Sequence, residues 1–255
     1  MKDWKQAARG FIDSCSFKDD IEAAFLTGSH AFGNADSFSD IDLYIILSDD
    51  VNWRERGSKE VYGFRIEYFA NPLHQVMQYI DDNYLSVRLP EINMILGGII
   101  IFDKNDMAEK TIAYCKQKLL SNFPKMNEFN IKMGLYTVWD NLDKLQRAYT
   151  NQTPDIAMQF FCFIKNTFEL YSRYIGSPIP NYHKWYRWLT DEDYSSRYGL
   201  DAYKDMCFLD KIKVAFKCTD PEAMLWLSTD LYQYITSEMG GLDVDDFILR
   251  GQLLL

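Results

Sequence analysis

The sequence predicts an α+β protein in which a strand-containing N-terminal part is followed by an all-helical C-terminal part. Up to residue 103, short apolar runs typical of a small mixed sheet alternate with amphipathic stretches, whereas beyond residue 105 helical periodicity dominates. The chain has 255 residues, 47% of them apolar, which is enough to form the core of one large domain or two small ones. We therefore expect two domains, 1–105 and 106–255, packed around a cleft.

The N-terminal elements each have their own signal. An apolar stripe from Trp4 to Ile12 predicts an amphipathic helix, and the apolar runs that follow predict strands. Pro72 ends the third strand, and the run from Gly97 to Phe102 predicts a further short, buried strand. The expected elements are a helix over 3–15, strands over 22–27, 40–47 and 61–70, a helix over 73–83 and a strand over 97–102.

The C-terminal part is divided by proline and glycine at Pro124, Pro154, the loop 176–180 and Pro221. Asp220 before Pro221 is typical of a helix start, with the aspartate as cap and the proline in the first turn. The expected helices cover 107–121, 129–150, 155–175, 183–189, 201–217 and 220–238.

Composition and charge exclude several classes of protein. The net charge is −10, whereas a protein that binds a long polyanion normally carries a basic face, so DNA and tRNA are not expected partners. No apolar run approaches the roughly 18 residues of a membrane span, and the first residues lack the apolar core of a secretory signal. Five scattered cysteines without a C-x-x-C pair favour buried free thiols over a zinc site. We expect a cytoplasmic protein without a membrane partner.

The strongest functional signal is a Gly-Ser pair followed by two aspartates. Gly28 and Ser29 end one apolar run, and after ten further residues Asp40 and Asp42 begin the next. Side chains two apart on a strand share a face, so these carboxylates point the same way, an arrangement tolerated where a divalent cation or a raised pKa removes the repulsion. A Gly-Ser turn can hold phosphate oxygens on backbone N–H groups. Together they favour Mg²⁺-dependent phosphoryl or nucleotidyl transfer over an ordinary solvated strand end.

This pattern resembles the signature of the DNA polymerase β-like nucleotidyltransferase superfamily. The resemblance is specific over residues 21–48 and extends to about residue 103. Positions 30 and 32, which are often basic in the family, are His30 and Phe32 here. The residues that match the pattern are Gly28, Ser29, Ala31, Gly33, Ser39, Asp40, Asp42 and Leu43.

The resemblance implies a reaction and a set of roles. Asp40 and Asp42 would hold Mg²⁺, and Gly28 and Ser29 would hold the β- and γ-phosphates of a nucleoside triphosphate, with ATP the expected one. The family often adds a third carboxylate from a neighbouring strand, as metal ligand or as base for the acceptor hydroxyl, and Glu67 fits that position. The alternative for Glu67 is a solvated strand residue.

Two further candidates lie in the helical part. Some antibiotic nucleotidyltransferases similar to this chain place the base on the first long helix of that part, where Asp140 and Asp143 share a face; a solvated acidic face is the alternative. Lys184 could neutralise phosphates and Trp185 could stack on a ring, or the pair could be a surface lysine beside a packing tryptophan.

The two-part layout looks like that of aminoglycoside- or lincosamide-modifying enzymes, so we expect a small hydroxylated acceptor and a role in antibiotic resistance. One rival function is the modification of a protein by an antitoxin-like nucleotidyltransferase. The other is a nucleotide-binding protein without turnover. The sequence leaves open the acceptor, the nucleotide base and the oligomeric state, a dimer included.

Overall fold

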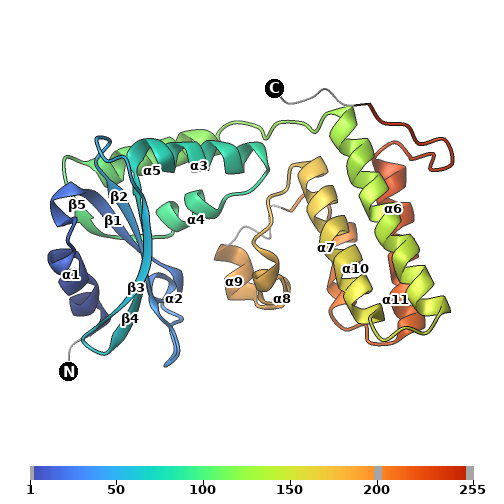
Figure 1. The fold of residues 1–255 in the computed structure, drawn as a ribbon, viewed down its shortest axis with the longest axis horizontal. Helices are drawn as coiled ribbons and strands as arrows, with labels where there is room; N and C mark the ends of the chain where they lie inside the picture. Colours follow the sequence, from blue (N-terminus) through green and yellow to red (C-terminus); the bar gives the residue numbers. More distant parts are fainter. Residues whose placement is uncertain (1–2, 198–202, 251–255) are drawn as a thin grey trace. The chain divides into compact units, whose positions relative to one another are not determined.

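The chain folds into two compact units, Met1–Asn122 and Phe123–Leu255, in a computed structural model that describes residues 3–197 and 203–250 (Figure 1). The first unit combines a sheet with helices, and the second is helical, which confirms the predicted fold class. The elements of the first unit are α1 (Trp4–Ser14), the 3-10 turn η1 (Lys18–Asp20), β1 (Ile21–Thr27), α2 (Gly28–Phe32), β2 (Ile41–Leu47), β3 (Glu55–Val61), β4 (Phe64–Pro72), α3 (Leu73–Leu85), α4 (Pro90–Leu96), β5 (Ile99–Asp103) and α5 (Met107–Leu119).

The sheet of the first unit has the strand order β3-β4-β2-β1-β5. Strands β2 and β4 run parallel, and the other neighbouring pairs are antiparallel, so the sheet is mixed as the sequence predicts. Because β1 and β2 are antiparallel, the end of β1 lies beside the start of β2. The start of β4 lies at the same end of the sheet, since β4 runs parallel to β2.

Alternation along β2 separates the two faces of the sheet. Ile41, Leu43, Ile45 and Leu47 point to the face covered by α1 and form a core with its apolar stripe. Asp42 lies on the opposite face, against which α3, α4 and α5 pack farther along the strands. Along β2, the face covered by α1 is therefore apolar, and the opposite face begins with a carboxylate.

The predicted strand 61–70 is in fact parts of two strands. Tyr62 and Gly63 form a two-residue hairpin turn with φ of 54° and 83°, which joins β3 to β4. The sequence did not predict β3 because its residues, ERGSKEV, are mostly polar and exposed at the sheet edge. The short helices α2, α4 and α9 (Glu192–Arg197) were also not predicted as separate elements.

The boundary between the units differs from the predicted one at 105/106, because α5 packs against β1, β5 and α4 of the first unit. Polar contacts also tie α5 to α3. The carboxylate of Asp81 accepts a hydrogen bond from the Tyr114 hydroxyl at 2.6 Å and pairs with the Lys118 ammonium at 2.6 Å. The first unit therefore continues to residue 122.

The second unit forms around a long helical hairpin of α6 and α7, against which α11 packs. The Asp220 side chain accepts a hydrogen bond from the Ala223 N–H at 2.9 Å and Pro221 opens α11, as predicted. The predicted helix 201–217 begins outside the described residues, and its described part is shorter. The elements are α6 (Glu128–Thr150), α7 (Ile156–Ile175), the 3-10 turn η2 (Tyr182–Lys184), α8 (Trp185–Thr190), α9, α10 (Met206–Ala215) and α11 (Pro221–Glu238).

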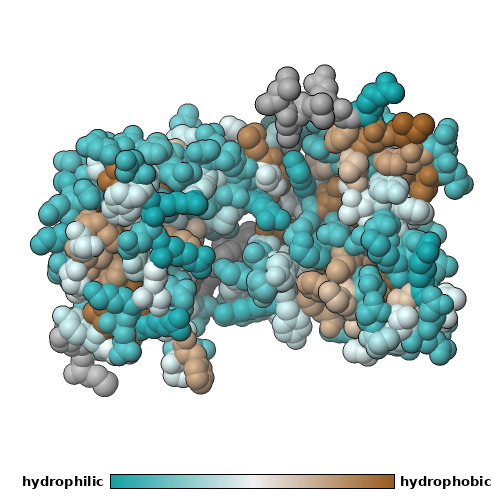
Figure 2. Space-filling model, in the orientation of Figure 1, coloured by the Kyte–Doolittle hydropathy of each residue, from teal (hydrophilic) through white to brown (hydrophobic). Residues whose placement is uncertain are grey.

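Some large apolar side chains of the second unit stay exposed, among them Met158 and Trp226, and Figure 2 shows apolar patches among the hydrophilic residues of its visible face. The cysteines are free, but only two of the five are buried, so the expectation of buried thiols is wrong for the other three. Cys15 and Cys115 are buried, Cys162 and Cys218 are half-buried, and Cys207 is exposed.

Candidate functional site

The structure brings Gly28 into direct contact with Asp42. β1 ends at Thr27, which is paired with Asp42 of β2, and α2 begins at Gly28. Gly28 has φ +65°, and a Cβ atom placed on it would lie 2.0 Å from Oδ2 of Asp42. Only glycine fits this position, because it alone adopts such a φ without strain and leaves room for the carboxylate.

A short, hydrogen-bonded loop returns the chain from α2 to Asp40. Gly33 ends α2 with φ +70°. The carboxylate of Asp36 accepts hydrogen bonds from the Phe38 N–H at 2.8 Å and the Ser39 hydroxyl at 3.0 Å. The Phe38 N–H is the main cause of the lowered pKa of Asp36. The loop therefore has a defined path from Ser29 to Asp40, which directly precedes β2.

Glu67 stands beside Asp42 on the neighbouring parallel strand. The register of β2 and β4 pairs Asp42 with Glu67, so the two residues share one face of the sheet. Carboxylates directly opposite each other on adjacent strands repel and destabilise the sheet unless a cation compensates. Glu67 has a cationic neighbour, because its Oε1 lies 3.9 Å from Nε of Arg65.

The residues of this end of the sheet fit a hard divalent cation. Mg²⁺ takes oxygen ligands, usually one or two carboxylates, and completes its shell with water and substrate phosphates. Asp42 supplies such a carboxylate in the space that the missing Gly28 side chain leaves, and Asp40 is two residues away. Within residues 3–197 and 203–250, no three His, Cys, Asp or Glu side chains gather in a metal-holding group.

The two departures from the family pattern are packing residues. The Phe32 ring lies against Gly97, where an added Cβ would be 2.7 Å from its Cζ. The His30 ring packs on Trp4, with ring centroids 5.5 Å apart, and within the described part of the chain its buried Nε2 has no hydrogen-bond partner. Both rings hold α2 against neighbouring helices.

Asp140 and Asp143 lie on α6 of the second unit, each in an ion pair one turn away. Asp140 pairs with Lys144 at 2.5 Å, and Asp143 with Arg147 at 2.7 Å. Exposed pairs of this kind are common on solvated helix faces and contribute little to stability. The contacts are those expected from the solvated-face alternative.

Lys184 and Trp185 have different surroundings. Lys184 is exposed at the start of α8. Trp185 is 1% exposed, its Nε1 donates to the Pro180 carbonyl at 2.8 Å, and its ring packs on Phe168 with a centroid distance of 4.8 Å. Trp185 is thus a core residue of the second unit.

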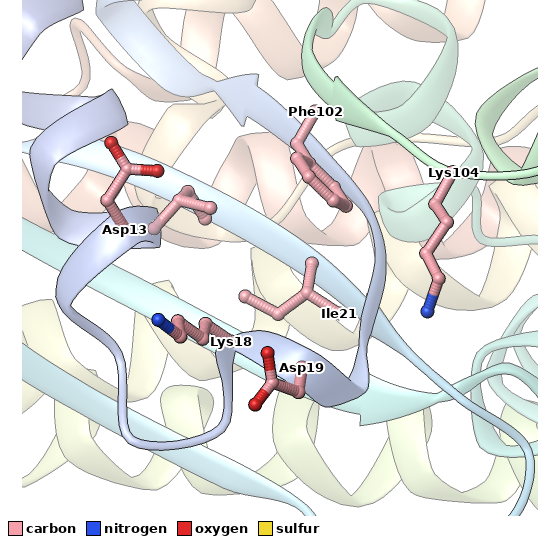
Figure 3. A pocket seen from close by; sticks show the side chains of 7 residues that line it. Asp13, Lys18, Asp19, Ile21, Phe102 and Lys104 are labelled. Carbon is pink, nitrogen blue, oxygen red and sulfur yellow. The ribbon is translucent and has the colours of Figure 1, made fainter.

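Two shallow hollows lie at the opposite end of the sheet from Asp42. One, of about 370 Å³, is lined by Lys18 and Asp19 before β1 and by Phe102 and Lys104 at the end of β5 (Figure 3). The other, of about 510 Å³, surrounds the ends of β2 and β4. Ile21, which lines the first hollow, lies six residue steps before Thr27 on β1, a distance of roughly 20 Å at strand spacing. Neither hollow belongs to the candidate site.

Comparison with known proteins identifies the part of the chain that holds this site. Residues 8–93 match the family model described as nucleotidyltransferase domain. This segment, about a third of the chain, is similar to nucleotidyltransferase domains. The chain is accordingly a transferase of the nucleotidyltransferase type. The matched segment contains Gly28, Ser29, Asp40, Asp42 and Glu67 and leaves out the whole second unit.

Two further comparisons add less. No curated protein matches the chain. Among solved structures, a nucleotidyltransferase-like protein from Exiguobacterium sibiricum is similar over 93% of this chain and 77% of its own, with 13% identity and a TM-score of 0.47. Within the described residues, no helix has the length and apolar character needed to cross a membrane.

Arg65 and Ser58 were not singled out from the sequence. Arg65 precedes Glu67 by two residues and so shares its face of β4. The alternation of side chains along a strand was therefore the sequence signal that could have placed Arg65 on the same face as Glu67. Ser58 lies on the unpredicted strand β3, where it pairs with Glu67, and no sequence signal pointed to it.

Proposed function

We propose that this protein transfers a nucleoside monophosphate from a nucleoside triphosphate, ATP in the first instance, to a hydroxyl group of a small molecule. Pyrophosphate is the second product, and Mg²⁺ is the required ion. The observation that carries the proposal is the packing of Asp42 against Gly28 with Glu67 next to it in register. In this packing the turn at Gly28, the Asp42 carboxylate and Glu67 lie in a row across β1, β2 and β4, which supports the roles that we propose for them.

The row assigns a role to each residue. Backbone N–H groups at Gly28 and Ser29 bind the β- and γ-phosphates. Asp40 and Asp42, which share a face if the chain is extended between them, hold the metal. Mg²⁺ bound there would neutralise charge on the attacking and leaving oxygens of the displacement. The turn and the carboxylates then fix the triphosphate for in-line attack.

Glu67 takes the proton of the acceptor. As the hydroxyl oxygen bonds to the α-phosphorus, the bond from phosphorus to pyrophosphate breaks and the hydroxyl proton moves to the carboxylate. A positioned base of this kind contributes about 10²–10⁴-fold. Glu67 serves as the third metal ligand in the alternative arrangement, in which Asp143 of α6 supplies the base. Lys184, a residue of the second unit, is the candidate cation that would neutralise charge on the phosphates.

A small hydroxylated acceptor agrees with the features outside the site. The net charge of −10 disfavours a long nucleic acid. The helical second unit corresponds to the substrate-binding part expected from the resemblance to aminoglycoside- and lincosamide-modifying enzymes, so antibiotics of these classes are the first acceptors to test. We place the reaction in the cytoplasm, where nucleoside triphosphates and Mg²⁺ are available.

The test is label transfer. The purified protein is incubated with Mg²⁺ and each α-labelled nucleoside triphosphate, in the presence of a panel of aminoglycosides and lincosamides. We expect label on at least one acceptor with release of one pyrophosphate per transfer, and loss of both with Asp42→Asn. Asp50→Asn is the matched control, because Asp50 is an exposed carboxylate just beyond the other end of β2.

Other outcomes would contradict the proposal in distinct ways. Label on a copurifying protein would favour the protein-modifying alternative. If the protein binds nucleotide in a Mg²⁺-dependent manner but releases no pyrophosphate with any acceptor, the second alternative, a nucleotide-binding protein without turnover, would be favoured.

A further inference from the structure

Arg65 is a cation on the acidic face of the sheet. Since β2 and β4 are parallel and Ile41 pairs with Ile66, extension of the register aligns Arg65 with Asp40, one step before the Asp42–Glu67 pair. Arg65 therefore stands among the carboxylates that the proposed function assigns to the metal and to the acceptor proton. Its place on β4 puts it on the side of Asp42 away from Gly28, which follows β1.

The contacts of Arg65 link it to Glu67. Its Nε lies 3.9 Å from Oε1 of Glu67 and donates a hydrogen bond to the Ser58 hydroxyl at 3.1 Å. Ser58 is the residue of β3 paired with Glu67, so the guanidinium is held from the edge strand while it faces the carboxylate. The side chains of Arg65 and Glu67 are 70% and 32% exposed.

The strength of this ion pair decides what it can do. An exposed pair at such a distance changes an equilibrium by at most about fivefold. A divalent ion that is also held by Asp40 and Asp42 has twice the charge and several ligands, so it can replace the guanidinium at Glu67. The pair partly compensates the charge of the carboxylate and is weak enough to be exchanged.

We infer that Arg65 is a positioning residue that acts as the counter-ion of Glu67 in the metal-free protein and releases it when the metal binds. The inference rests on the proposed function, because it requires Glu67 to face the metal. Arg65 offsets part of the repulsion between Glu67 and Asp42 until a bound metal takes over that role. The free energy of metal binding is then smaller by the free energy needed to break the ion pair.

Lys59 provides a matched comparison. It lies on β3 opposite Ile66, so it points to the face of the sheet covered by α1. There its charge acts on the buried thiol of Cys15, the pKa of which burial raises to about 11 and the lysine partly lowers. Removing Lys59 changes the net charge as much as removing Arg65 but leaves the acidic face unchanged.

The test measures Mn²⁺ affinity of the nucleotide-free protein by electron paramagnetic resonance. Arg65→Gln should tighten Mn²⁺ binding by about two- to fivefold. Lys59→Gln should leave the affinity unchanged within the error of the titration. Arg65→Lys, which keeps the positive charge, should have the wild-type affinity. In a Glu67→Gln background, Arg65→Gln should not change the Mn²⁺ affinity. Circular dichroism confirms that each variant is folded.

The outcomes separate the two proposals. If Mn²⁺ binds in a manner that depends on Asp42 but Arg65→Gln has no effect, or has the same effect without Glu67, the role of Arg65 is refuted and the proposed function stands. If the wild-type protein binds no Mn²⁺, the metal site of the proposed function fails, and the inference about Arg65 fails with it.

Discussion

Replacement of Gly28 by alanine is the most specific perturbation of the site that the structure offers. The φ of +65° imposes a strain of about 1–2 kcal/mol on any residue with a Cβ atom. That atom would lie 2.0 Å from Oδ2 and 2.9 Å from Cγ of Asp42, so the carboxylate must move. A displacement of about 1 Å in a catalytic group can lower a rate by about 100-fold. We expect Gly28→Ala to lose about 1–2 kcal/mol of unfolding free energy and at least about 100-fold in turnover.

Gly63 supplies the control. It has φ +83°, and an added Cβ atom would have no heavy atom within 4 Å. Gly63→Ala should therefore lose about the same unfolding free energy in urea, because the backbone strain is alike, and keep its turnover. Pyrophosphate release from an α-labelled triphosphate measures the second quantity. The reasoning is refuted if Gly28→Ala turns over at a near-native rate, or if Gly63→Ala loses as much turnover as Gly28→Ala.

The remaining predictions concern the base, a helix cap and the thiols. Glu67→Gln should lower kcat by about 10²–10⁴-fold, and Asp143→Asn by less than about threefold because it removes only a surface ion pair; the reverse result in steady-state kinetics would move the base to α6. Asp220→Ala should cost about 1 kcal/mol of unfolding free energy in urea, since α11 loses its cap, and an unchanged midpoint would show that the cap is dispensable. Burial raises the pKa of Cys115 to about 12, so at pH 8 iodoacetamide should modify the exposed Cys207 first; mass spectrometry of the peptides would reveal the opposite order.

Local signals predicted most of the fold because they coincide with burial. The apolar runs that became β1 and β2 are buried, and Asp220 with Pro221 is a local helix-start signal that α11 confirms. β3 gave no such signal, since an exposed edge strand needs no apolar face. The end of the first unit was also missed, because the helical period of α5 does not say which core the helix joins.

The candidate site was predictable as far as it is local. Gly28 and Asp42 are linked by one short loop, so their spacing carried the signal. The register that sets Glu67 beside Asp42 depends on parallel pairing of β2 with β4 and on the hairpin that makes β3 the edge strand. The pairing of β2 with β4 is a long-range choice that no local pattern in the sequence encodes, and the alignment of Arg65 with Asp40 follows from it.

Calorimetric titration with a non-hydrolysable triphosphate analogue, in the presence and absence of Mg²⁺, asks most directly whether Asp42 and the turn at Gly28 act together. The wild-type protein should bind the analogue only with Mg²⁺, and Asp42→Asn should weaken that binding by at least about tenfold while the far-ultraviolet circular dichroism stays unchanged. Equal affinity of the folded variant and the wild type would remove Asp42 from the metal site and contradict the account.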